Sequence, residues 1–218
     1  MAKKKTLGKR DIMGFYMENV LSHNKKPNSV YAFAKDNGFE EAKFYEFFGN
    51  FESLEEAVFA TFFENTVSIL EKSDDYNSFG PKDKLLSFYF TFFENLTANR
   101  SYVVYALEHN KNNMSSLKKL VRLKKHFVNY IEKLGINTIE IKQETLEKLQ
   151  RRSLKESAWL QLLVTLKFWL DDTSPSFEKT DVFIEKSVRA SFDLIDTTPL
   201  HSIIDFGKFL ITEKIRMN

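Results

Sequence analysis

The chain has 218 residues, of which 43% are hydrophobic and 28% are charged, and its formal net charge is +2. This composition is ordinary for a globular protein, and the length suits one large domain or two small ones. The absence of cysteine excludes disulfides, thiolate metal sites and cysteine nucleophiles, and seven glycines and four prolines are too few for a many-stranded β-sandwich or barrel.

The sequence also predicts where the protein resides. The basic N-terminus, MAKKKTLGKRDI, is not followed by an apolar run, so it lacks the pattern of a signal peptide. No stretch approaches the roughly 20 apolar residues that a transmembrane helix needs. Because the lack of cysteine also fits a reducing compartment, we expect a cytoplasmic protein without a transmembrane segment.

Apolar side chains recur at helical spacing nearly throughout the chain. Asn28 or Ser29 can cap a short helix that Gly38 ends, residues 73–83 have the composition of a loop, and Pro81 suits the first position of the next helix. The sequence therefore predicts an all-α protein with about ten helices and no internal repeats. The predicted helices span residues 9–23, 30–36, 40–47, 52–71, 82–96, 101–110, 117–134, 143–171, 177–196 and 199–215.

Charge is distributed unevenly along these helices. Residues 1–27 carry seven basic and two acidic side chains, whereas residues 28–60 carry two basic and seven acidic ones. Residues 111–133 are again basic, with Glu132 as their only acid against seven lysines and arginines. The total charge is therefore uninformative, and its segregation is the feature that bears on partners.

Residues 117–134, LKKLVRLKKHFVNYIEKL, are predicted to form one basic amphipathic helix. Such a helix can lie on an anionic membrane, but more often it packs on its apolar face and leaves its basic face in solvent, and we expect the second arrangement. The apolar face comprises Leu117, Leu120, Val121, Phe127, Val128 and Ile131. The basic face comprises Lys118, Lys119, Arg122, Lys125 and His126.

Residues 28–54 have helix-turn-helix spacing, with two short helices joined by a glycine turn after a longer helix. Their sequence, NSVYAFAKDNGFEEAKFYEFFGNFESL, resembles without a gap the N-terminal domain of the tetracycline-repressor (TetR) family. The matching positions are Ser29-Val30, Phe33-Ala34, Gly38-Phe39, Phe44-Tyr45, Phe48, Gly49 and Leu54. The resemblance implies a helix-turn-helix domain over residues 1–52 and a helical ligand-binding and dimerisation domain over residues 53–218.

The resemblance also implies which residues would contact DNA. An alternative for the N-terminal lysines is a solubilising tail, and an alternative for Tyr45 is packing within the helical cluster. The Lys25-Lys26 pair is a further source of positive charge near this domain. The candidate DNA-binding residues are Asn28, Ser29, Lys35, Lys43 and Tyr45, with Lys3, Lys4 and Lys5 as a basic arm.

This sequence departs from the family pattern where the family usually meets DNA. Phe51 replaces the family's phosphate-binding lysine, and we expect it to be structural. Glu40 and Glu41 open the recognition helix, where they would face base edges. Carboxylates can accept hydrogen bonds from cytosine amino groups, but together with Glu46 they also repel phosphates. The recognition helix alone should therefore bind DNA weakly.

The remaining helices offer a ligand pocket and a dimer interface. Aromatic residues of the middle helices either enclose an apolar ligand, as the resemblance implies, or pack as solid core. The last two predicted helices carry more apolar surface than a terminal pair needs, and in the family this pair forms a two-fold interface. The candidate pocket residues are Phe88, Tyr89, Phe92, Tyr105, Trp159, Leu163 and Trp169. The candidate interface residues are Phe192, Ile195, Ile203, Ile204, Gly207, Leu210 and Ile211.

Nothing in the sequence indicates catalysis or a cofactor. The four histidines lack i, i+4 metal spacing, no glycine loop suits a phosphate, and the acidic segment 171–181 lacks the ligand order of a calcium loop. Two functions remain open. One is a dimeric, cytoplasmic TetR-like repressor that binds double-stranded DNA and responds to a small apolar ligand. The other is a TetR-fold protein that binds a lipid or another apolar ligand without binding DNA.

Overall fold

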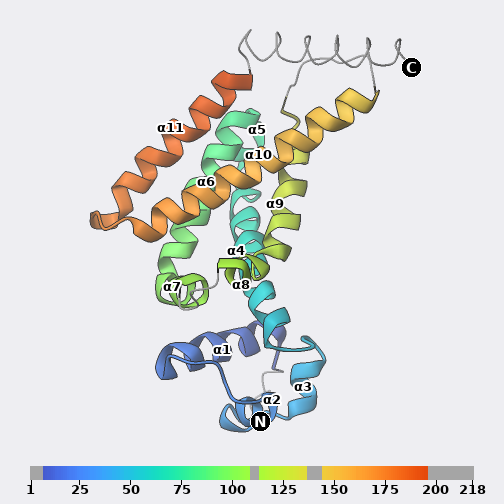
Figure 1. The fold of residues 1–218 in the computed structure, drawn as a ribbon, viewed down its shortest axis with the longest axis vertical. Helices are drawn as coiled ribbons and strands as arrows, with labels where there is room; N and C mark the ends of the chain where they lie inside the picture. Colours follow the sequence, from blue (N-terminus) through green and yellow to red (C-terminus); the bar gives the residue numbers. More distant parts are fainter. Residues whose placement is uncertain (1–6, 109–112, 137–143, 196–218) are drawn as a thin grey trace. The chain divides into compact units, whose positions relative to one another are not determined.

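The computed structural model describes residues 7–108, 113–136 and 144–195, and every regular element in these ranges is helical (Figure 1). The predicted all-α fold is therefore confirmed. No helix in the same ranges is long and apolar enough to cross a membrane. The elements are α1 (Lys9–His23), α2 (Val30–Asp36), α3 (Glu41–Tyr45), α4 (Phe51–Leu70), α5 (Asp74–Ser78), α6 (Pro81–Ala98), α7 (Arg100–Glu108), α8 (Asn113–Lys118), α9 (Val121–Lys133), α10 (Glu144–Asp171), the 3-10 turn η1 (Pro175–Phe177) and α11 (Glu178–Ile195).

The chain divides into two compact units. The first unit combines Met1–Ser68 with Phe92–His126, and the second combines Ile69–Thr91 with Phe127–Asn218. Helices α4, α6 and α9 each contribute residues to both units. The boundary at residue 52 that the family resemblance implies stays a prediction.

Local capping signals place the first helices of the first unit. The backbone amide of Gly8 donates to the Asp11 carboxylate at 2.9 Å, which caps α1 at its predicted start. The Ser29 hydroxyl accepts from the amide of Ala32 at 3.1 Å and caps α2. Gly38 follows α2 with a φ of 69°, a left-handed conformation that glycine adopts without strain. Helix α3 has five residues and is shorter than the predicted segment 40–47.

An aromatic cluster holds these short helices together. Phe33 of α2 is fully buried at its centre. Its ring centroid lies 6.2 Å from Tyr16, 5.6 Å from Phe39, 6.2 Å from Phe44 and 5.7 Å from Phe51, with the rings edge to face in each pair. Edge-to-face contacts add to the stabilisation from burial alone. The cluster explains how helices of five and seven residues persist, since helices this short are not stable by themselves.

The predicted loop over residues 73–83 contains a helix, α5. The Ser73 hydroxyl accepts from the amide of Tyr76 at 3.4 Å and caps this helix. The Tyr76 side chain is buried, and its hydroxyl lies 2.9 Å from the hydroxyl of Tyr130. The polar composition, with a glycine and a proline, is typical of a loop, but the buried tyrosine holds one turn of helix in place. The loop prediction is wrong for these five residues.

The predicted single basic helix is also wrong, because it is divided into α8 and α9. The amides of Lys119 and Leu120 at the break donate to carbonyls three residues earlier, as in a tight turn. Lys119, predicted in solvent, is only 6% exposed, and its ammonium group donates to the carbonyl of Ala106 at 2.5 Å. Conversely, Leu117 and Val121, predicted on the packed face, are exposed. The break turns the helix so that a lysine enters the interior.

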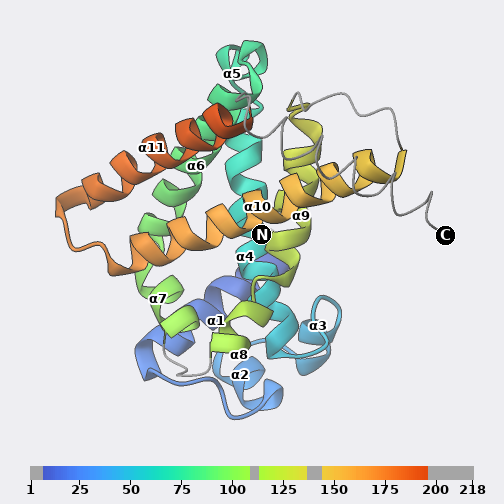
Figure 2. The same cartoon turned by 45° about the horizontal axis from the view of Figure 1, so that its top comes forward.

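Helices α10 and α11 of the second unit run side by side and are joined through η1, as Figures 1 and 2 both show. The rings of Phe168 and Phe183 stack at 4.5 Å with an interplanar angle of 13°. The connection is held by Asp172, which is buried. Its two carboxylate oxygens accept from the amide and hydroxyl of Ser174, at 2.8 and 2.6 Å, and from those of Thr180, at 2.9 and 2.7 Å.

Replacing Asp172 by asparagine is expected to destabilise the protein at neutral pH by about 2 kcal/mol, because hydrogen bonds to a buried charge are lost. Burial alone would raise the pKa of Asp172, but the hydrogen bonds from Ser174 and Thr180 outweigh it and hold the pKa well below its usual range. A lowered folded-state pKa contributes stability that is present above the unfolded pKa, about 3.9, and is lost as the pH falls further.

The difference between wild type and Asp172→Asn should therefore shrink below about pH 4, as measured by urea unfolding at several pH values. Asp171→Asn is the matched control, since that carboxylate is exposed and forms a surface ion pair with Lys167 at 2.6 Å. A difference between wild type and Asp172→Asn that is as large at pH 3 as at pH 7 would contradict this assignment.

Candidate functional site

The candidate DNA-binding residues in the described part of the chain lie on and around α2 and α3. Asn28, Ser29, Lys35 and Tyr45 are exposed, and Tyr45 retains 52% of its accessible surface. Its ring touches Phe44 edge to face at 5.5 Å without being enclosed. Tyr45 is therefore available to a partner, which leaves its role as a phosphate donor open. Lys3, Lys4 and Lys5 lie outside the described residues.

Carboxylates lie on and beside α3, the predicted recognition helix. The ammonium group of Lys43 forms an ion pair with Glu46 at 2.6 Å and lies 5.3 Å from the centre of the Phe47 ring. The hydroxyl of Tyr45 lies 3.4 Å from the carboxylate of Glu41. Partial desolvation and this carboxylate raise the pKa of Tyr45, so the hydroxyl remains a donor. The ion pair with Glu46 therefore weakens the attraction of Lys43 for a phosphate.

Two further residues near the helix-turn-helix have structural roles. Phe51, which stands where the family has a phosphate-binding lysine, stacks on Tyr16 at 5.4 Å and thus packs as expected. Lys26, considered as a source of positive charge for DNA, instead points inward. Its ammonium group lies 3.0 Å from the carboxylate of Glu55 and 3.7 Å from that of Glu52. It faces protein carboxylates, and its contribution to a DNA-binding surface stays a prediction.

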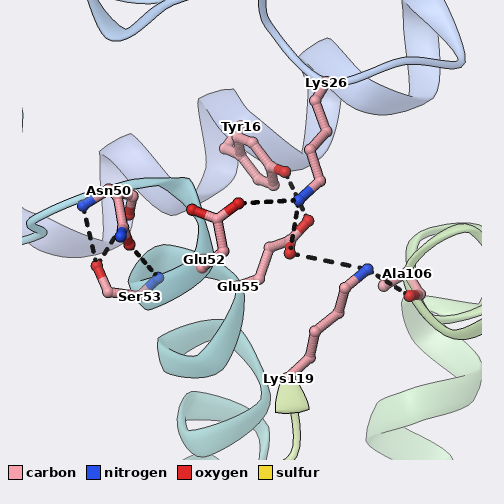
Figure 3. Close-up of polar contacts among 8 residues, drawn as sticks. All are labelled: Tyr16, Lys26, Asn50, Glu52, Ser53, Glu55, Ala106 and Lys119. Atoms are coloured by element: carbon pink, nitrogen blue, oxygen red, sulfur yellow. Dashed lines mark hydrogen bonds and ion pairs between the residues drawn. The ribbon is translucent and has the colours of Figure 1, made fainter. Parts of the chain in front are cut away.

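A buried ionic cluster around Glu55 was not predicted from the sequence (Figure 3). Glu55 is 1% exposed and lies within reach of Tyr16, Lys26 and Lys119. Its position carried a signal, since Glu55 is four residues after Phe51 and so shares a helix face with an apolar residue. The start of α4 beside it is capped by Asn50, whose side chain accepts from the Ser53 amide at 2.8 Å.

The candidate pocket residues are divided between the two units. Phe92 and Tyr105 belong to the first unit, and the other five belong to the second. In the second unit Phe88 and Tyr89 lie 5.5 and 6.3 Å from Phe127, whose ring is 6.4 Å from Trp159. Phe127 therefore joins three of the candidates, although the sequence indicated only that it belongs to an apolar face. All four rings are buried.

The other two candidates of the second unit lie along α10. Trp169 is fully buried and contacts Phe177 of η1 at 6.0 Å, and Leu163 is half-buried. An open groove of about 440 Å³ lies on the surface of α10 and α11. Within the described ranges, no three carboxylate or histidine side chains gather in a way that would hold a metal ion. The groove is lined by Phe168, Glu178, Lys179, Val182, Phe183 and Lys186.

The dimer-interface candidates lie mostly beyond the described residues. Phe192 and Ile195 are half-buried on α11. The helix α10 nearby exposes an apolar row at i, i+4 and i+8, where Leu160, Val164 and Phe168 retain 60%, 48% and 36% of their surface. This row was not among the predicted interface residues, although its four-residue spacing is visible in the sequence. The remaining candidates, Ile203, Ile204, Gly207, Leu210 and Ile211, lie outside the described residues.

Comparison with known proteins identifies the family. Residues 84–210 match the model of the tetracyclin repressor-like C-terminal domain, which is more than half of the chain. No curated protein matches the sequence. The match does not include residues 1–83, where the helix-turn-helix spacing lies. Proteins of this kind are typically regulators without enzymatic activity. The chain belongs to the tetracycline-repressor (TetR) family.

Proposed function

We propose that this chain is a dimeric TetR-like transcriptional repressor that binds double-stranded DNA and is released by a small apolar ligand. The observation that supports it best is two short helices joined by a glycine turn, an arrangement consistent with a helix-turn-helix, in the same chain as a TetR C-terminal domain. Ser29 caps α2, Gly38 makes the left-handed turn, and α3 buries Phe44 while exposing Tyr45. In this proposal α3 is the recognition helix, with Phe44 anchoring it and Tyr45 free to face DNA.

In this proposal DNA affinity comes from residues around the recognition helix more than from the helix itself. Tyr45 and the exposed start of α2 at Asn28 and Ser29 would donate hydrogen bonds to phosphates, with Lys35 adding charge. The N-terminal lysines 3–5 would supply the remaining electrostatic attraction as a basic arm. The role that the resemblance assigns to Lys43 is opposed by the charge of Glu46, which pairs with it.

Fluorescence anisotropy with DNA from the region upstream of the protein's own gene tests this proposal. A specific site should bind at least about a hundredfold more tightly than random DNA at the same salt concentration, and affinity should fall as salt rises. Affinity no higher than that for random duplex at low salt would overturn the repressor function.

Removing the charge of Glu40 and Glu46 is expected to raise DNA affinity about three- to tenfold at low salt, because two carboxylates no longer repel the phosphates. Glu46→Gln also releases Lys43 from its ion pair. The matched control is Glu147→Gln with Glu185→Gln, which removes two arginine-paired carboxylates from α10 and α11. Equal gains in the two double variants would show that α3 does not face DNA.

The apolar row on α10 supplies the expected dimer contact. Leu160→Glu is expected to convert the dimer to a monomer at micromolar concentration, since two-fold symmetry places two unpaired carboxylates in the interface. Light scattering after size-exclusion chromatography measures the mass. Ile69→Glu is the control, because Ile69 of α4 is similarly exposed, at 57%. If the Leu160→Glu variant still has the mass of a dimer, the dimer interface does not include this row.

A second candidate function is a TetR-fold protein that binds a lipid or another apolar ligand and no DNA. The observation that favours it is the ion pair of Lys43 with Glu46 on a surface that already exposes Glu40. Mass spectrometry under native conditions distinguishes the two when combined with the anisotropy measurement. A co-purifying apolar compound with no DNA binding supports the second function, and DNA binding released by such a compound supports the first.

A further inference from the structure

The carboxylate of Glu55 is the meeting point of three separate segments of the first unit (Figure 3). Tyr16 of α1 donates its hydroxyl to Glu55 at 2.7 Å. Lys26, from the connection between α1 and α2, approaches at 3.0 Å, and Lys119, from the break between α8 and α9, at 3.7 Å. A carboxylate that is 1% exposed must be paired, because burying an isolated charge is very unfavourable.

The two lysines are held differently. The Lys119 side chain is 8% exposed, and its ammonium group also donates to the Ala106 carbonyl of α7 at 2.5 Å. The Lys26 side chain is 35% exposed and can turn to water or to Glu52, whose carboxylate is 3.7 Å away. Burial lowers the pKa of Lys119, and Glu55 partly offsets this effect. The charge of Lys119 is therefore stabilised only by its protein partners, whereas the charge of Lys26 can also be stabilised by water or by Glu52.

Two cations that share one carboxylate compete for it. Each lysine weakens the attraction that the other feels, because their charges repel across the same oxygen atoms. If Lys119 withdraws, Glu55 depends on Lys26 alone and holds it more firmly. Lys26 stands three residues before Ser29, which caps α2, so a change at Lys26 acts directly on the start of that helix.

We propose that Glu55 is a switch point that couples the position of α7 and α8 to the start of α2, through the competition of Lys119 and Lys26 for its carboxylate. The regulatory use of this coupling rests on the proposed repressor function, but the coupling itself is a property of the folded chain. A shift of the α7 backbone at Ala106 draws Lys119 away from Glu55. Lys26, which is already 3.0 Å from Glu55, then has no competing cation and is held there more firmly, so the connection leading into α2 tightens.

A double-mutant cycle tests whether the carboxylate is shared. Lys26→Met and Lys119→Met each leave Glu55 with one cation, whereas the double variant leaves a buried carboxylate with none. Each single variant raises the unfolding equilibrium constant relative to wild type by some factor. In the double variant the constant should rise at least about tenfold more than the product of these two factors. In a Glu55→Gln background this excess should disappear. Additive effects with Glu55 present, or an excess that persists in the Glu55→Gln background, would overturn the proposal.

The matched control for the cycle is Lys26→Met combined with Lys155→Met. Lys155 pairs with Glu132 at 2.8 Å in the second unit, so the two effects should add. None of these measurements uses DNA or a ligand. If the protein fails to bind DNA, the repressor function is wrong, but the coupling at Glu55 is unaffected. If the effects in the cycle are additive, the coupling is wrong, but the repressor function is unaffected.

Hydrogen exchange supplies a second readout that needs only single variants. Lys119→Met should slow amide exchange in peptides covering residues 24–36 at least about threefold, because Lys26 is then held more firmly. A role in stability alone predicts the opposite sign, since a destabilised unit exchanges faster. Lys155→Met should leave these peptides unchanged. If amide exchange in these peptides is unchanged or faster in Lys119→Met, the two lysines do not compete for Glu55 and the proposal is wrong.

Discussion

Replacing Phe33 by alanine is expected to lower the free energy of unfolding of the first unit by about 3–5 kcal/mol, the range for large aromatic truncations in a packed core. Phe33 is fully buried, and its ring lies within 6.2 Å of the ring centroids of Tyr16, Phe39, Phe44 and Phe51. A loss of this size is a large fraction of the stability of an ordinary domain. Helices α2 and α3 should open first, because their short lengths make them depend on this cluster.

Hydrogen exchange of peptides covering residues 30–48 measures this effect, together with urea unfolding followed by circular dichroism. Tyr31→Ala is the control on the same helix, since Tyr31 is 61% exposed and its truncation should cost about 0.5 kcal/mol or less. A loss below about 1 kcal/mol for Phe33→Ala, with exchange unchanged, would show that the cluster is not what holds α2 and α3 in place.

Replacing Phe127 by alanine is expected to cost the second unit a similar amount, about 3–5 kcal/mol. The fully buried ring lies 5.5 Å from Phe88, 6.3 Å from Tyr89 and 6.4 Å from both Tyr130 and Trp159. Its removal leaves a cavity among these four aromatic rings. Because those rings cannot all move into the space, most of the lost contact energy is not recovered.

Tryptophan fluorescence reports this change directly, since both tryptophans of the chain belong to the second unit. The emission of Phe127→Ala should shift and its urea midpoint fall, whereas Phe33→Ala should leave native-state emission unchanged. Val121→Ala is the control on α9, because Val121 is 58% exposed. A midpoint for Phe127→Ala equal to that of wild type would contradict the central position of this ring.

Most helices of this protein follow from signals that lie within a few residues of one another. Helix α1 begins where the apolar spacing predicts, and Asp11 caps its first turn. Ser29 and Gly38 likewise set the start of α2 and the turn after it, since capping and a left-handed turn are local chemistry. Even the ion pair between Lys43 and Glu46 could be predicted, because residues three apart on a helix are neighbours.

The sequence by itself therefore determined the all-α class, the short helices α2 and α3 with the glycine turn between them, and the acidic character of α3. Only the tertiary structure decided the position of Lys119. In the sequence it is one of many cations in a basic helix, and it reaches the interior because the helix breaks where Ala106 and Glu55 can receive an ammonium group. Tyr76 is a second example of a position that the sequence did not predict. Its segment has the composition of a loop but forms α5, in which the Tyr76 hydroxyl contacts that of Tyr130, a residue distant in sequence. Caps and turns depend on neighbours in the chain, whereas the environment of a buried polar group depends on which distant segments surround it.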